Sequence, residues 1–394
     1  MKYAVLIADG MADRPLKELN GKTPLEAANT PNMDQIAKNG IVGNVATVPK
    51  GFAPGSDIAL MSIFGYDPAK YYTGRGPLEA ANMGVDLKAG DVAFRCNLVT
   101  IVDGAMNDFT AGHISDEEAS EIIKFIDSNL GSKDIKFYPG VSYRHLAVIK
   151  NGPIKAKCTP PHDITNKPIA KYLPKGSGSE ILRKLMDESS PLLAKHKVNL
   201  ERIKAGKRPA NMIWLWGQGR KPDMPTFKKK YGLTGSVITA VNLIKGIGRI
   251  AGLSVINVPG ATGYFDTNYL GKARYALKEL EKKDFVLVHL ESPDEAGHMG
   301  NLKEKMRAIE NFDELVVGTI LKGLKKFKEY RVLVLPDHPT PVSIMTHSGE
   351  PVPFTVCGSG IKAGGINSFS EKASSRSKLL IKRGHELLDF FFDH

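Results

Sequence analysis

Short apolar runs alternate with helical stretches along most of the chain, and this alternation limits the fold more than any other feature. Runs of four to six residues rich in β-branched side chains are typical of strands buried on both faces. The expected strands are residues 3–8, 212–216, 253–258, 285–290, 332–335 and 354–357, and the expected helices are 236–250, 269–281 and 302–327. Strands separated by crossover helices predict an α/β fold: a mostly parallel sheet with helices on both faces. Ligands of such sheets bind beyond the carboxyl ends of the strands.

The middle of the chain has a different pattern. Strand-like runs at 93–102 and 143–149 flank a single helix, 116–130, and residues 160–161 and 175–179 are rich in proline, glycine and serine. We interpret residues 86–177 as a smaller α+β domain inserted into the first. The main domain is then discontinuous and consists of residues 1–85 and 178–394.

The amino-acid composition limits the kinds of molecule that the protein is expected to bind. Lysine and arginine number 54 against 42 acidic residues, a net charge of +12 that favours nucleic acid or a small phosphorylated metabolite. The basic residues are scattered and belong to no binding module, so nucleic acid is not expected. Three distant cysteines (Cys96, Cys158, Cys357) argue for a reducing cytoplasm. Without a long apolar run or a secretory pattern at the start, no membrane partner is expected. The oligomeric state is left open.

Aspartates and histidines follow several of the expected strands. Taken singly, each is explained by a turn, a helix cap or a satisfied histidine. Because the sheet brings its carboxyl ends to one edge, we expect these side chains to converge. Mixed carboxylate and imidazole ligands suit Mn, Zn, Co or Fe, with Mg at an oxygen-rich position, and six of them are enough for a two-metal centre. The six are Asp9, Asp294, His298, Asp337, His338 and His347, whereas His289, inside an apolar run, is interpreted as a core residue.

Ser56 precedes the apolar stretch 58–64 in the sequence APGSD. A helix cap explains it, since a serine oxygen satisfies free backbone amides. Phosphoryl chemistry explains it equally well, because the positive end of a helix attracts phosphate. A serine hydroxyl is a poor nucleophile until a base or a metal activates it. Both interpretations of Ser56 stay open on spacing alone.

An ordered set of motifs resembles the archaeal-type cofactor-independent phosphoglycerate mutases, of the alkaline phosphatase superfamily. The resemblance covers essentially the whole chain. It is carried by IADG (7–10), TPNMD (30–34), PGSD (54–57), PDEAGH (293–298), PDH (336–338) and THSGEPVPF (346–354). It implies an alkaline-phosphatase-like sheet with an inserted lid, and interconversion of 3- and 2-phosphoglycerate without a bisphosphoglycerate cofactor.

The resemblance also implies roles for individual residues. One divalent ion is held by Asp294, His298 and His347, and the other by Asp9, Ser56, Asp337 and His338. Ser56 becomes phosphorylated, and Mn²⁺ is the expected metal, with Mg²⁺, Co²⁺ or Zn²⁺ as alternatives. The insert, residues 86–177, binds the substrate and excludes water, because a mutase open to water would act as a phosphatase.

A substrate with a phosphate and a carboxylate calls for cations. Arginine suits bidentate binding of both groups. The candidate substrate-binding residues are Arg75, Arg95, His113, Arg144 and Asp163, each of which is explained equally well as a surface charge or a loop cap.

Residues 108–113 depart from the archaeal pattern. An arginine tends to stand near the position of His113 in the archaeal mutases, and this segment resembles instead a bacterial subgroup proposed to act as a homoserine kinase. A homoserine kinase-like phosphotransferase is therefore the first alternative. A metal-dependent phosphatase or sulfatase is a further one, disfavoured by the expected lid.

Overall fold

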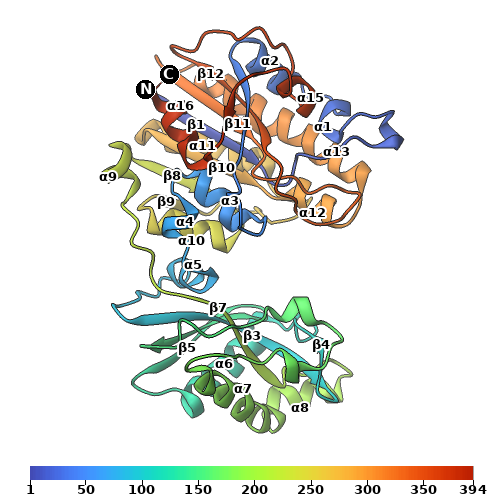
Figure 1. Cartoon of the computed structure of the whole chain (residues 1–394), viewed down its shortest axis with the longest axis vertical. Helices are drawn as coiled ribbons and strands as arrows, with labels where there is room; N and C mark the ends of the chain where they lie inside the picture. The colour runs from blue at the N-terminus through green and yellow to red at the C-terminus, as the bar shows by residue number, and fades with distance from the viewer. Residues whose placement is uncertain (394) are drawn as a thin grey trace. The chain divides into compact units, whose positions relative to one another are not determined.

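A computed structural model describes residues 1–393, which divide into two compact units. Of the described residues, the first unit comprises 1–72 and 224–393, and the second comprises 73–223. Figure 1 shows the strands of the first unit as one layer with helices on either side of it. The predicted α/β fold with an inserted smaller α+β unit is confirmed. No helix within residues 1–393 is both long enough and apolar enough to cross a membrane.

The first unit is built on an eight-stranded sheet of order β13-β2-β12-β11-β1-β10-β8-β9. Its central strands β11, β1, β10 and β8 are parallel, whereas β12 runs antiparallel to both of its neighbours. The strands are β1 (Lys2–Ala8), β2 (Ile41–Val45), β8 (Gly235–Ile238), β9 (Ser254–Ile256), β10 (Phe285–Leu290), β11 (Tyr330–Leu335), β12 (Val352–Gly358) and β13 (Leu380–Ile381).

Helices cover both faces of this sheet because successive strand residues point to opposite sides. On one face, Ala4 and Leu6 share a core with α2 (Pro31–Lys38), α11 (Tyr269–Lys282) and α14 (Thr319–Leu324). On the other, Tyr3 contacts Phe391 of α16 (Leu387–Asp393) with ring centres 5.6 Å apart. The helices α3 (Ser56–Ile63) and α10 (Asn242–Ile250) complete that second layer. The unit also has four short helices: α1 (Pro24–Ala27), α4 (Pro68–Tyr71), α9 (Phe227–Tyr231) and α15 (Glu371–Ser374).

The second unit is a five-stranded antiparallel sheet with helices packed on it. Its strands are β3 (Asp91–Val102), β4 (Ala105–Asp108), β5 (Ile135–Val141), β6 (Arg144–Lys150) and β7 (Met212–Gly219). Its helices are α5 (Arg75–Asn82), α6 (Asp116–Leu130), α7 (Ser179–Ala194) and α8 (Lys197–Lys204). The unit extends beyond the predicted insert, residues 86–177, in both directions along the chain. Helix α5, which precedes the predicted insert, and α7, α8 and β7, which follow it, all pack with this sheet.

Two predictions about local elements are wrong, and a third element differs in detail. Residues 212–216 do not join the main sheet but pair antiparallel with β3 in the second unit. Residues 236–250 are not one helix, since they include most of strand β8. The predicted helical stretch 302–327 is confirmed as helical to residue 324, but its middle, Phe312–Gly318, is a π-helix between α13 (Leu302–Asn311) and α14. An apolar run shows that a strand is buried on both faces, but not which sheet it joins.

Candidate active site

The predicted metal ligands lie together at one edge of the eight-stranded sheet. Asp9 follows β1, and Asp337 and His338 follow β11. After β10 the chain enters α12 (Ser292–His298), whose second residue is a proline, a residue favoured at helix starts. Asp294 and His298 are four positions apart on α12 and so share one helix face.

The first group of candidate ligands is Asp294, His298 and His347. His298 Nε2 lies 3.2 Å from Asp294 Oδ2 and 2.9 Å from His347 Nε2, which is 3.5 Å from Asp294 Oδ1. Ligands of a tetrahedral ion with bonds of about 2.0–2.1 Å are roughly 3.3 Å apart. These spacings therefore suit a divalent ion held by one carboxylate and two imidazoles.

The second group surrounds the hydroxyl of Ser56 at the start of α3. Ser56 Oγ lies 3.3 Å from Asp9 Oδ2 and 3.1 Å from His338 Nε2. His338 Nε2 is 3.4 Å from both Asp9 Oδ1 and Asp337 Oδ2. Asp337 Oδ1 accepts from the amides of Gly10 and His338, whereas Oδ2 is buried without a hydrogen-bond partner. A buried, unpartnered carboxylate oxygen fits a metal ligand.

Burial and the neighbouring charges shift the pKa values of several candidate ligands. Burial raises the pKa of Asp9 well above its usual value, and the carboxylates of Asp337 and Asp294 add to the increase. Burial acts upward on Asp294 too, but hydrogen bonds from His298 and His347 outweigh it and hold its pKa well below its usual value. Burial lowers the pKa of His338, which favours the neutral imidazole that binds metals. A divalent cation would relieve the crowding of carboxylates.

Thr340 connects the two groups of ligands and was not identified from the sequence. Its hydroxyl lies 2.5 Å from Asp294 Oδ1 and 3.2 Å from His338 Nδ1. Gly10, with a φ of +60°, leaves room for this contact, because a Cβ there would lie 2.6 Å from both Asp294 Oδ1 and Thr340 Oγ1. A threonine in a loop gives no local signal of such a role.

His289 is buried as predicted, but it does not pack as an apolar core residue. Its Nε2 is 3.2 Å from Asp9 Oδ2 and its Nδ1 is 3.2 Å from Glu291 Oε1. Burial opposes a charge on this ring, but Asp9 and Glu291 outweigh it and raise the pKa of His289 to about 10. The other side of Glu291 is bonded to Lys272, whose side chain is fully buried. The sequence did not predict this polar cluster, because His289 is surrounded by apolar residues in the strand.

In the second unit, two of the predicted arginines lie against the ring of Trp216. The guanidinium of Arg95 is 4.7 Å from the ring centre and that of Arg75 is 5.8 Å from it. His162, which was not predicted, lies 5.3 Å from the same ring. Burial lowers the pKa of Arg95, partly offset by Glu79, and its Nε is buried without a hydrogen-bond partner. A guanidinium with an unused donor, such as that of Arg95, suits an anionic ligand.

The remaining substrate-binding candidates are more exposed. Arg144 stacks on Tyr143 with its guanidinium 5.5 Å from the ring centre, and it is close enough to Arg95 to lower the pKa of that side chain further. Asp163 Oδ1 lies 3.6 Å from His162 Nε2, at the margin of the same cluster. His113 lies on an exposed turn after β4, with a φ of 49°.

Comparisons with known proteins give a consistent result. A family model described as 2,3-bisphosphoglycerate-independent phosphoglycerate mutase matches residues 37–199. A protein of Geobacter sulfurreducens named as a probable member is 51% identical over 398 residues, covering 100% of both chains. A Methanosarcina acetivorans protein named 2,3-bisphosphoglycerate-independent phosphoglycerate mutase is 52% identical over 391 residues, covering 98% of both chains.

Solved structures agree with these matches. The PH0037 protein from Pyrococcus horikoshii is 34% identical with a TM-score of 0.84, covering 100% of this chain and 96% of that one. The cofactor-independent phosphoglycerate mutase of Thermoplasma acidophilum is 29% identical with a TM-score of 0.70, covering 100% and 99%. With full-length identity of about half to several members, the chain belongs to the family of 2,3-bisphosphoglycerate-independent phosphoglycerate mutases.

Proposed function

We propose that this protein is a metal-dependent mutase that interconverts 3- and 2-phosphoglycerate through a phosphoserine at Ser56. The observation that carries the proposal is the position of the Ser56 hydroxyl, at a helix start and within 3.4 Å of Asp9 and His338. Relatives covering the full chain carry the name of this activity.

Two sets of residues would hold divalent cations, which supply positive charge to a transferring phosphoryl group and lower the pKa of a bound hydroxyl. Asp294, His298 and His347 form one set. Asp9, Ser56, Asp337 and His338 form the other. The imidazoles in both sets favour Mn²⁺, Co²⁺ or Zn²⁺ over Mg²⁺, and we propose Mn²⁺.

In the proposed reaction, Ser56 Oγ forms a bond to the substrate phosphorus while the bond from phosphorus to the C3 oxygen breaks. The proton lost by Ser56 is balanced by the proton that the C3 oxygen gains. The C2 hydroxyl of the retained glycerate then takes the phosphoryl group back, and Oγ recovers its proton. The amides at the start of α3 stabilise the negative charge of the group in transit.

The second unit is proposed to bind the substrate. Arg75, Arg95 and Arg144 offer guanidinium groups to the carboxylate and the phosphate, and His113 and Asp163 orient the glycerate hydroxyls. Retaining the glycerate between the two transfers requires that water stay out, and this unit is proposed to act as the lid.

An enolase-coupled assay with 3-phosphoglycerate and no bisphosphoglycerate tests the proposal. Turnover is expected with Mn²⁺ and is lost with chelator, and Ser56→Ala should abolish it while leaving thermal unfolding unchanged. A parallel reaction contains homoserine and a phosphoryl donor. Turnover in that reaction alone, or wild-type turnover by the alanine variant, would refute the mutase route through Ser56.

A further inference from the structure

The side chain of His289 has an unused nitrogen close to a carboxylate of the proposed ion site. His289 is the fifth residue of β10 and is fully buried. Its Nε2 has no hydrogen-bond partner, although Asp9 Oδ2 is only 3.2 Å away. This separation would allow a hydrogen bond, but the angle at the ring nitrogen does not meet the geometry of one.

The opposite nitrogen of the ring is firmly held. His289 Nδ1 lies 3.2 Å from Glu291 Oε1, and that oxygen also accepts from the hydroxyl of Thr239 at 3.0 Å and the amide of Ala240 at 2.9 Å. Glu291 Oε2 accepts from Lys272 at 2.7 Å. Since an ionised carboxylate only accepts, the shared hydrogen belongs to His289 Nδ1. Nε2 is then the nitrogen available to a ligand.

A second unpartnered atom points to the same place. Asp337 Oδ2 is buried without a hydrogen-bond partner, because the amides that bind Asp337 reach only Oδ1. Ligand atoms of Asp9, His289 and Asp337 all lie within 4.8 Å of one another, and all three residues are buried. Two orphaned buried ligand atoms beside a third carboxylate form a set that a cation would satisfy.

We propose that His289 is an additional ligand, through Nε2, of the cation held by Asp9 and Asp337, and that Glu291 fixes the ring for this role. The inference rests on the proposed metal-dependent function, and it adds a residue to that site. A histidine that donates its second N–H to a carboxylate is the usual arrangement around metals in proteins.

This ligand bears on which metal the site selects. An added imidazole raises the preference for Mn²⁺, Co²⁺ or Zn²⁺ relative to Mg²⁺, which prefers oxygen. The competing arrangement is an imidazolium that only donates to Asp9 and contributes no nitrogen to the ion. The two arrangements differ in the number of metal-bound imidazoles, which spectroscopy can count.

The test uses the full-length protein loaded with Co²⁺. Each cobalt-bound imidazole gives a strongly shifted, exchangeable N–H proton signal, and that of His289 Nδ1 should exchange slowly because it is buried against Glu291. In His289→Gln this signal should be absent and Co²⁺ affinity, measured by calorimetry, should fall at least about tenfold. His145→Gln is the matched control, since His145 is a buried histidine of the second unit. It should change neither signal nor affinity.

The outcomes separate the two proposals. A full set of shifted signals and unchanged Co²⁺ affinity in His289→Gln, with metal-dependent wild-type turnover, would overturn the role of His289 alone. Failure of the wild type to bind Co²⁺ or Mn²⁺ would overturn the proposed function as well. Should His289→Gln not fold, Glu291→Gln provides the test: the slowly exchanging signal should shift and exchange faster, and an unaltered signal would refute the proposal.

Discussion

Replacing Lys305 with methionine should strongly destabilise the first unit. The ammonium group of Lys305 is fully buried, lies 2.7 Å from Asp13 Oδ2 and donates to the carbonyl of Thr340 at 2.8 Å. It thereby joins the loop after β1 to the loop after β11, next to the proposed ligands. Methionine keeps the apolar stem but leaves the carboxylate of Asp13 buried without its cation. Breaking one partner of a buried pair costs about 3–5 kcal/mol.

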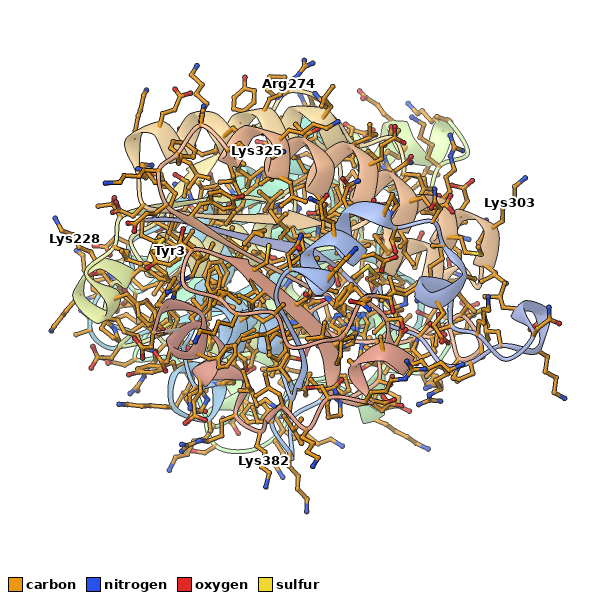
Figure 2. All side chains as sticks on the ribbon, turned by 90° about the horizontal axis from the view of Figure 1, so that it is seen from above. Tyr3, Lys228, Arg274, Lys303, Lys325 and Lys382 are labelled. Atoms are coloured by element: carbon orange, nitrogen blue, oxygen red, sulfur yellow. The ribbon has the colours of Figure 1, made fainter. Side chains whose placement is uncertain are left out.

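The assay is urea and thermal unfolding followed by circular dichroism. For a unit of this size the loss corresponds to a fall in Tm of roughly 6–20 °C. The control is Lys303→Met on the same helix, whose side chain is exposed and projects outward in Figure 2, and it should change stability by less than about 0.5 kcal/mol.

A double variant isolates the cause. Asp13→Asn removes the charge that Lys305→Met leaves behind, so the two changes together should be less harmful than their sum, by about 0.5–3 kcal/mol. Strict additivity, or a Lys305→Met protein as stable as the Lys303→Met control, would show that the ion pair does not hold these loops.

Three further predictions concern other parts of the molecule. Burial, aided by the charge of Arg144, lowers the pKa of His145 to about 3 from 6.5, so between these values the unfolded state binds more protons. The free energy of unfolding should therefore fall as the pH drops below about 6.5, by at most about 1.4 kcal/mol per pH unit. In His145→Gln, urea titrations at several pH values should give a smaller fall per pH unit, and an equal fall in both proteins would contradict this. Gly10→Ala should weaken Mn²⁺ binding about 10–100-fold, because its Cβ would displace Asp294 and Thr340; native affinity in calorimetry would contradict the packing argument. Mn²⁺ at a hundred times its Kd should stabilise the wild type by about 2.7 kcal/mol and chelator should reverse this, whereas an unchanged Tm would count against a metal site.

Local signals in the sequence predicted individual elements well where the cause is itself local. Helix α6 has the predicted bounds, 116–130, because Ser115 and Glu118 form a capping box at its start. The π-helical segment, in contrast, contains Asp313, which accepts hydrogen bonds from the amides of Asn32 and Met33 at the start of α2. That tertiary contact joins residues some 280 positions apart and leaves no local pattern.

The same distinction holds for the candidate site. Aspartates and histidines directly after strands can be recognised, because a parallel sheet brings strand ends to one edge. His289 and Lys272 cannot, since each is a buried polar residue inside a strand or helix whose partner lies on another element. Trp216 was missed because an aromatic residue in an apolar run is most simply a core residue, and His162 because a lone histidine in a proline-rich loop gives no local signal.

The sheet topology explains why even the residues near antiparallel strands reach this edge. Strand β12 runs opposite to β11, and Val334 pairs with Thr355, so β12 begins where β11 ends. His347, which precedes β12, therefore lies beside His338, with ring centres 4.3 Å apart, although it does not follow a parallel strand. Val45 at the end of β2 pairs with Val352 at the start of β12, so the loop to Ser56 leaves from the same edge. The reversed strand β12 thus brings His347 to the site from before its start, and β2, which runs in the same direction as β11, brings the proposed nucleophile from beyond its end.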